Sequence, residues 1–302
     1  MSSTETAALR FRDLDTASSA EFMDAMLEGQ LAAIASVHAV RARLVEAVDA
    51  ASERMRGGGR LIYLGAGTSG RLATLDAAEL PPTFGWPASR AVSLMAGGLG
   101  AFVEAVEGAE DDVDKPVSDL VALKLSARDV VVGIAASGRT PFVRAGLLHA
   151  KSVGALTIAI LNNPGAVIGD IADIAIEPDT GAEVLAGSTR MKAGTAQKAA
   201  LTCFSTGIFR NLGYIYKGRM VEMGATNDKL VERAAEMVED LTGASRSAVV
   251  EALGACKHSV KHAVVMIERG LSAEAASELI DASGGRLRDA LAPSTDGPET
   301  IG

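Results

Sequence analysis

Three short segments of the chain combine glycine with hydroxyl side chains. The first contains Gly67, Thr68 and Ser69, the second is residues 137–140 (SGRT), and the third is residues 187–192 (GSTRMK). All three precede a predicted helix, and the first two directly follow a predicted strand. Backbone N–H groups at a helix N-terminus, together with hydroxyls, suit a phosphate monoester. The proposed phosphate-binding residues, here called the phosphate cradle, are Gly67, Thr68, Ser69, Ser137, Gly138, Arg139, Thr140, Ser188, Thr189 and Lys192.

Helix capping and dinucleotide binding are the alternatives to a phosphate cradle. Serine and threonine are favoured N-cap residues, so helix capping accounts for any one segment equally well, whereas three similar segments together favour the cradle. The first segment also matches the dinucleotide fingerprint, with Gly65, Gly67 and Gly70 at the required spacing. That fingerprint needs an acidic residue at the end of the second strand. The second predicted strand ends in residues 94–98 (LMAGG), which contain none, so no cofactor is expected.

Carboxylates near predicted helix ends are the second candidate group. Glu79 lies near the end of the helix that follows the first segment, and Glu107 and Glu110 lie at the end of a helix predicted over residues 101–108. The negative end of a helix dipole disfavours a carboxylate anion and raises its pKa, as a general acid requires. For any single glutamate, a solvated helix end is the ordinary alternative.

Histidine and cysteine offer less. His258 and His262 are four positions apart, with Cys256 nearby, a spacing that can hold a metal. No HExxH pattern is present, however, and Lys257 and Lys261 lie beside them, so a solvated helix face is favoured and no metal is expected.

Composition limits the class of protein. The net charge of −9 argues against a nucleic-acid partner, and the two cysteines are interpreted as free thiols in a reducing compartment. The chain shows no secretory signal and no apolar run long enough to cross a membrane. We therefore expect a cytoplasmic protein that acts on a small molecule.

Strands and helices alternate in the first two thirds of the chain, which predicts a parallel sheet flanked by helices. Beyond residue 224 only short helical patterns remain. We therefore expect an N-terminal helical segment (1–56), a sheet domain (57–224) and a small all-helical C-terminal module (225–302). Strands are predicted at 60–64, 91–95, 129–135, 155–161 and 171–176. Helices are predicted at 21–55 (as one or two), from 72 to a stop at Pro81 and Pro82, and at 101–108, 117–124, 142–152 and 192–212.

Several long segments resemble the N-acetylmuramic acid 6-phosphate etherase family, and the resemblance runs from about residue 13 to about residue 292. The segments are residues 60–71 (RLIYLGAGTSGR), 79–85 (ELPPTFG), 106–111 (VEGAED), 129–141 (DVVVGIAASGRTP), 162–165 (NNPG), 187–198 (GSTRMKAGTAQK) and 225–230 (ATNDKL). The sequence departs from the family pattern at residues 8–14, where an Asn-Pro-rich start is usual, and at Ala78 and Leu80, where the family has Ser and Cys.

The resemblance implies a sugar-isomerase (SIS) domain with a helical C-terminal module. It also implies a carbon–oxygen lyase that converts N-acetylmuramic acid 6-phosphate and water to N-acetylglucosamine 6-phosphate and D-lactate during cell-wall amino sugar recycling. By the same resemblance, Glu79 is the acid that protonates the departing lactate oxygen, and Glu110 is the second catalytic residue and the base at C2.

The residues suit this chemistry. Opening the sugar to its aldehyde makes the C2 proton acidic, so one carboxylate can remove it while a carboxylic acid assists the leaving alkoxide. Glu79, however, lies ten residues beyond Ser69, which is about 15 Å along a continuous helix. We therefore expect a homodimer with the active site near the interface, in which Glu79 serves the neighbouring subunit's sugar.

Two other functions remain open on these residues. A sugar-phosphate sensor is one, because the glucokinase regulatory protein resembles the same family, although it carries two SIS domains. An aldose–ketose isomerase is the other, and it would use a similar cradle without the segments that contain Glu79 and Glu110.

Overall fold

The computed structural model describes residues 3–224 and 228–293. Residues 225–227 of the ATNDKL segment, and the chain from residue 294 onward, lie outside the described residues. The chain divides into two compact units. Unit 1 comprises Met1–Glu79 and Pro87–Ile208, and unit 2 comprises Leu80–Trp86 and Phe209–Gly302.

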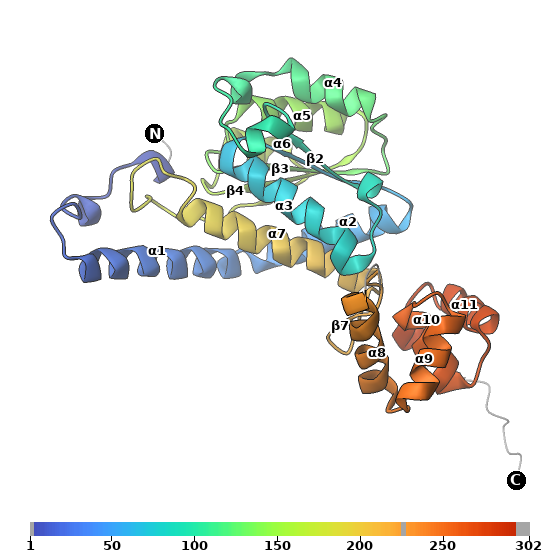
Figure 1. The fold of residues 1–302 in the computed structure, drawn as a ribbon. Coiled ribbons are helices and arrows are strands. Elements are labelled where there is room, and N and C mark those ends of the chain that lie inside the picture. Colours follow the sequence, from blue (N-terminus) through green and yellow to red (C-terminus); the bar gives the residue numbers. More distant parts are fainter. Residues whose placement is uncertain (1–2, 225–227, 294–302) are drawn as a thin grey trace, which may run out of the picture. The chain divides into compact units, whose positions relative to one another are not determined.

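Unit 1 is built on a five-stranded parallel sheet with the order β2-β1-β3-β4-β5 (Figure 1). Every residue of β1, β3 and β4 is buried, as expected for apolar strands covered on both faces. The predicted parallel sheet flanked by helices is confirmed. The strands are β1 (Leu61–Gly65), β2 (Ala91–Met95), β3 (Val130–Ala135), β4 (Leu156–Leu161) and β5 (Ile174–Ile176).

The longest predicted helix is two helices, α1 and α2, which meet at Val40. Ser18 and Glu21 form a capping box at the start of α1. The α-helices that begin in unit 1 are α1 (Ser19–Ala39), α2 (Arg41–Arg56), α3 (Gly67–Phe84), α4 (Asp114–Ala122), α5 (Pro141–Ser152), α6 (Val167–Ile171) and α7 (Lys192–Asn211). Short 3-10 helices are η1 (Ser3–Glu5), η2 (Leu9–Phe11), η3 (Ala88–Arg90), η4 (Leu99–Phe102) and η5 (Ala109–Asp111).

Two helix predictions are wrong. The helix expected at residues 101–108 is absent: only the end of η4 overlaps that range, and Gly108, at the expected end, adopts a φ angle of +69° that a right-handed helix does not allow. The helix expected to stop at Pro81 continues to Phe84. Both prolines lie in the last turn, where each lacks the N–H that would donate to the carbonyl four residues back, and the helix ends two residues after Pro82.

The two faces of the sheet pack against different helices. Ile62 and Leu64 of β1 belong to a core shared with α4, α5 and α6. Tyr63, between them, points to the other face, where its hydroxyl donates to Asp76 of α3. α2 packs on this second face against β3, β4 and β5.

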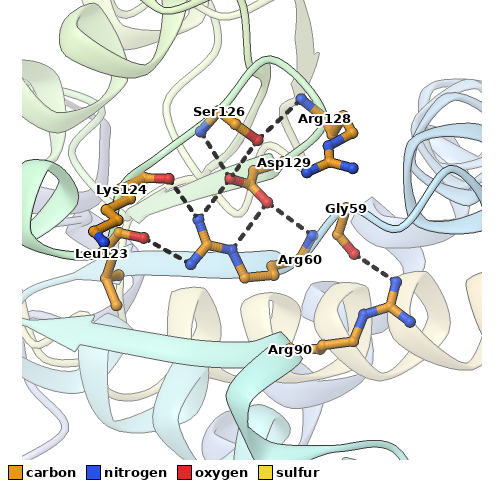
Figure 2. A network of polar contacts seen from close by, with 8 residues as sticks. All are labelled: Gly59, Arg60, Arg90, Leu123, Lys124, Ser126, Arg128 and Asp129. Atoms are coloured by element: carbon orange, nitrogen blue, oxygen red, sulfur yellow. Dashed lines mark hydrogen bonds and ion pairs between the residues drawn. The ribbon is translucent and has the colours of Figure 1, made fainter.

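A polar network joins the amino ends of β1 and β3 (Figure 2). Arg60 Nη2 lies 2.7 Å from Asp129 Oδ2, and Arg60 Nε donates to Asp129 Oδ1 at 3.0 Å. The backbone N–H groups of Arg60 and Ser126 also donate to this carboxylate, each at 2.9 Å. Burial alone raises the pKa of Asp129, but these donors together outweigh it and hold the pKa below its ordinary value.

Unit 2 consists mainly of short helices. Ser245 and Ser272 are the N-cap residues of two of these helices, and their side chains accept hydrogen bonds from the N–H groups of Ala248 and Ala275. A two-stranded hairpin that was not predicted precedes the helices. The elements are β6 (Ile215–Tyr216), β7 (Arg219–Met220), α8 (Asp228–Thr242), α9 (Arg246–Ala255), α10 (Val260–Arg269), α11 (Ala273–Ala282) and α12 (Leu287–Ala290).

The predicted solvated face of α10 is corrected at one position. Lys261 is only 2% exposed, although its neighbours in sequence suggested a charged surface. Its ammonium donates to Gly285 O at 2.6 Å, pairs with Glu222 and lies 5.5 Å from the centre of the Tyr214 ring. These three partners explain how unit 2 accommodates a buried cation.

Candidate active site

The first cradle segment lies inside a helix. α3 begins at Gly67, so Thr68 and Ser69 lie in its first turn, where N–H groups lack helical acceptors, and not in a loop before a helix that starts at residue 72. A Cβ on Gly65 would come within 2.8 Å of the Gly70 backbone, so these glycines permit the close packing of strand and helix. The dinucleotide-like spacing therefore has a structural explanation.

Ser69 links α3 to α7 through a chain of buried amides. Its hydroxyl donates to Gln197 Oε1 at 2.9 Å, and Gln197 Nε2 donates to Asn162 Oδ1 at 2.9 Å. A Cβ on Gly194 would lie 3.4 Å from Thr68 Cγ2, so the first turn of α3 packs directly against the first turn of α7. The first and third cradle segments are therefore neighbours.

The second cradle segment follows β3, which pairs with β1 so that Ile134 lies opposite Gly65. Gly138 has a φ angle of +66°, and a Cβ there would lie 2.3 Å from the Ala166 Cβ, so only glycine fits. Thr140 occupies the N-cap position of α5 but makes no side-chain cap hydrogen bond. Helix capping therefore does not account for this hydroxyl.

The third cradle segment leads into α7, and a carboxylate already caps that helix. Glu183 is fully buried, and its two oxygens accept the N–H groups of Lys192 and Ala193, each at 2.9 Å. The Lys192 ammonium donates to Ala182 O at 2.8 Å, and burial lowers its pKa. Glu183 thus satisfies N–H donors that a phosphate was expected to occupy, and Ser188 and Thr189 remain half-buried between the exposed residues Gly187 and Arg190.

The N-terminal segment contacts the same edge of the sheet. The Ser3 hydroxyl donates to Asn163 Oδ1 at 2.8 Å, and Asn163 Nδ2 donates to Thr4 Oγ1 at 3.0 Å and to Ala136 O at 2.7 Å. The Gly187 N–H donates to Thr4 O at 3.2 Å. The first described residues therefore connect the second and third cradle segments, a role that no local sequence signal indicated.

Glu110 and Glu107 line a pocket of about 190 Å³ together with Gly67 and Arg71. Both glutamates are exposed, and no residue beyond 110 contributes to the lining. The structure therefore brings a predicted catalytic carboxylate to the start of α3, beside the phosphate cradle.

Glu79 does not line this pocket. Glu79 is exposed on α3. Because α3 is continuous from Gly67 to Phe84, Glu79 lies about 15 Å along the helix axis from Ser69. Within one chain, the pocket brings Glu107 and Glu110 beside Gly67 of the cradle, and Glu79 is not among its lining residues.

Asp76 is a titratable residue of α3 that lies outside the sequence motifs. It accepts a hydrogen bond from the Tyr63 hydroxyl at 2.6 Å and another from Ser205 Oγ at 3.1 Å. Burial raises the pKa of Asp76 to about 6, although both hydroxyls lower it. Burial between β1, α3 and α7 has no local sequence signature, so only the structure shows this residue.

Neither a metal site nor a membrane span is found in the part of the chain that the structure describes. Residues 3–224 and 228–293 contain no group of three or more His, Cys, Asp or Glu side chains placed to hold a metal ion. Among the same residues, no helix is both long and apolar enough to cross a bilayer.

Comparison with known proteins agrees with this architecture. A family model described as the glucokinase regulatory protein N-terminal SIS domain matches residues 43–151, and the SIS domain model matches residues 99–206. A phosphoheptose isomerase structure from Francisella tularensis superposes with a TM-score of 0.50 at 18% identity, covering 64% of this chain and all of that one. That likeness concerns the fold alone.

Curated relatives extend over nearly the whole chain. A protein from Enterobacter sp. (strain 638) is 49% identical over 92% of this chain and 94% of its own length, and one from Mycolicibacterium smegmatis is 46% identical over 95% and 97%. A third, from Deinococcus radiodurans, is 45% identical over 93% and 92%. All three are named N-acetylmuramic acid 6-phosphate etherase. With this identity over this length, the chain belongs to the N-acetylmuramic acid 6-phosphate etherase family.

Proposed function

We propose that this protein cleaves the D-lactyl ether of N-acetylmuramic acid 6-phosphate, giving N-acetylglucosamine 6-phosphate and D-lactate in cell-wall amino sugar recycling. The observation that carries the proposal is the pocket that Glu110 shares with Gly67 at the start of α3. A phosphate on the cradle leaves the sugar ring within reach of this carboxylate. The etherase relatives support the same reaction, and we place the enzyme in the cytoplasm.

In the proposed reaction, the open-chain aldehyde makes the C2 proton acidic. Glu110 takes that proton, a C2–C3 double bond forms, and the C3–O bond breaks with its electron pair moving to the lactyl oxygen. Glu79 supplies the proton that this oxygen needs. Water then returns a hydroxyl to C3 and a proton to C2, so the sequence is a lyase step followed by hydration. Each positioned acid or base contributes about 10²–10⁴-fold to the rate.

Glu79 is assigned to the neighbouring subunit of a homodimer, because it lies far along α3 from the cradle of its own subunit and faces solvent. A large apolar stripe on α1 supports the dimer. Met23, Leu27, Leu31 and Ile34 recur at helical spacing and are 48–72% exposed.

The charges on α1 favour a second copy as the occupant of this stripe. Glu21 and Asp24 lie at the start of the helix, and His38 and Arg41 lie at or just beyond its end. An antiparallel pair sets the acidic start of one copy near the basic end of the other. We also propose that residues 1–56, 57–224 and 225–302 act as distinct parts of the subunit.

The function is tested by measuring D-lactate released from the muramic acid phosphate. Release is expected from the natural protein and should fall by about 10²-fold or more in Glu110→Gln, with Glu104→Gln as the matched control on the same exposed segment. Tight sugar-phosphate binding without release would instead support a sensor.

The shared site is tested by mixing subunits. Glu79→Gln has an intact cradle, and a Thr68→Val, Ser137→Ala variant has an intact Glu79. Random heterodimers should recover about a quarter of the natural activity, since half of the dimers then hold one complete site. Heterodimers that form but stay inactive would contradict the exchange. Leu27→Glu with Leu31→Glu should convert dimers to monomers in light scattering.

A further inference from the structure

Arg71 lies one turn into α3 and lines the same pocket as Glu110. Its Nε donates to Phe102 O at 2.9 Å, and its Nη2 donates to Ala101 O at 2.8 Å. Through these bonds Arg71 holds η4, the start of the segment that carries Glu107 and Glu110. A guanidinium has five N–H donors, and the two bonds use only two of them.

The charge of Arg71 has no anionic partner among the described residues. None of the ion pairs within residues 3–224 and 228–293 includes it, and its two hydrogen-bond acceptors are both neutral carbonyls. Arg71 is half-buried and is the one cationic side chain among the described lining residues. The pocket thus presents a guanidinium with free donors to whatever occupies it.

The size and lining of the pocket suit a small carboxylic acid. Ala101, Ala105 and Val106 supply an apolar wall for a methyl group. A neutral occupant would leave the charge of Arg71 unmatched, and an anion without Arg71 would face the repulsion of Glu107 and Glu110. A guanidinium binds a carboxylate through two parallel hydrogen bonds.

The reaction places a carboxylate in this position. Glu110 acts at C2, and the lactyl ether is on C3, the adjacent carbon, so the lactyl group lies next to the C2 proton that Glu110 removes. We propose that Arg71 binds the carboxylate of the departing hydroxy acid and thereby selects ethers that carry an anionic substituent. This inference rests on the proposed etherase function and assigns the substituent that the Arg71 pocket recognises.

The test compares two ethers that release the same sugar phosphate. One carries the natural lactyl carboxylate, and the other carries a carboxamide in its place. The kcat/KM for release of the common sugar product is measured for the natural protein, for Arg71→Gln and for Arg71→Lys. The matched control is Arg128→Gln, which changes an exposed arginine near the amino ends of β1 and β3, outside the pocket lining (Figure 2).

The natural protein and Arg128→Gln should prefer the carboxylate by about 10–100-fold, the range expected for a charge-assisted pair. Arg71→Gln should reduce this preference to about threefold or less, and Arg71→Lys should retain part of it, since it keeps the charge but not the paired donors. Because Arg71 also holds η4, both rates can fall, so the ratio between the two ethers is the decisive quantity.

Three results would overturn the inference. A natural protein that cleaves both ethers equally shows that the carboxylate is not recognised. Equal loss on both ethers in Arg71→Gln, with the preference intact, shows that Arg71 only holds η4. If the natural protein cleaves neither ether while binding sugar phosphate, the proposed function itself fails. If Arg71→Gln does not fold, as judged by circular dichroism, the preference for the carboxylate ether is compared between Arg71→Lys and the natural protein. An undiminished preference in Arg71→Lys then overturns the inference.

Discussion

Replacing Asp76 by Asn should make the stability of the protein less dependent on pH. Burial raises the pKa of Asp76 to about 6, against 3.8 for an ordinary aspartate. Between those two values the folded state keeps a proton that the unfolded state has lost. The free energy of unfolding therefore falls as pH rises from about 4 through 6, and this contribution to stability is present in full only below about pH 4.

The size of the effect follows from the two pKa values. At about 1.4 kcal/mol per pH unit, the difference corresponds to about 3 kcal/mol. The side chain is half-buried, so solvent screening reduces this to about 1–2 kcal/mol. The amide of the Asp76→Asn variant stays neutral at every pH, can accept from the Tyr63 hydroxyl and can donate to Ser205 Oγ. Asp76→Asn should therefore gain about 1.5 kcal/mol relative to the natural protein between pH 4 and pH 8.

Urea unfolding followed by far-UV circular dichroism at pH 4, 6 and 8 measures this gain. Tyr63→Phe is the matched control, because it removes a donor that lowers the pKa of Asp76 and should make the loss of stability with rising pH steeper. If the difference between Asp76→Asn and the natural protein is the same at pH 4 and pH 8, Asp76 does not titrate with a raised pKa and the reasoning is refuted.

Two further predictions concern stability. Asp129→Asn should cost about 2–3 kcal/mol in urea unfolding at pH 7, because it replaces a buried carboxylate held by Arg60 and two backbone N–H groups. The pKa of Asp129 is depressed in the folded state, so this advantage of the natural protein should shrink as pH falls below about 4. An advantage that does not shrink with acidification below about pH 4 would contradict this account. His258→Gly should stabilise unit 2 by about 0.5–1 kcal/mol, because His258 has a φ angle of +61° that glycine adopts without strain. Trp86 fluorescence during unfolding measures this change, and the control Lys229→Gly, in α8, should destabilise unit 2 instead. Equal destabilisation by both substitutions would show that no strain is relieved at His258.

Patterns that repeat within one element could be interpreted from the sequence. The apolar runs around Ile62 and Val132 predicted strands because a strand covered on both faces needs apolar side chains at every position. The glycine–hydroxyl segments and the positions of Glu79 and Glu110 were likewise evident, since each lies in a contiguous motif. The helix expected at residues 101–108 does not form, and the left-handed conformation of Gly108 at its expected end was not evident from the periodic pattern.

Contacts between distant residues were beyond this kind of prediction. Glu183 caps α7 from nine and ten positions away, and Lys261 is buried by partners at 214, 222 and 285. Neither arrangement has a period or a short motif, because a buried charge depends on which elements meet in space. For the same reason the sequence suggested a solvated face where Lys261 is enclosed.

The order of residues along the chain was enough to predict the class of fold and the family, and it is the basis on which the segments of the phosphate cradle are proposed. These properties depend on residue types within single strands, turns and helices. The folded structure was needed to show that Glu110 and Arg71 share a pocket at the start of α3, that Glu79 lies outside it, and that Asp76 is half-buried beneath two hydroxyl donors. The physical reason is that burial, pKa and charge pairing are properties of a folded neighbourhood, which is assembled from segments far apart in the chain.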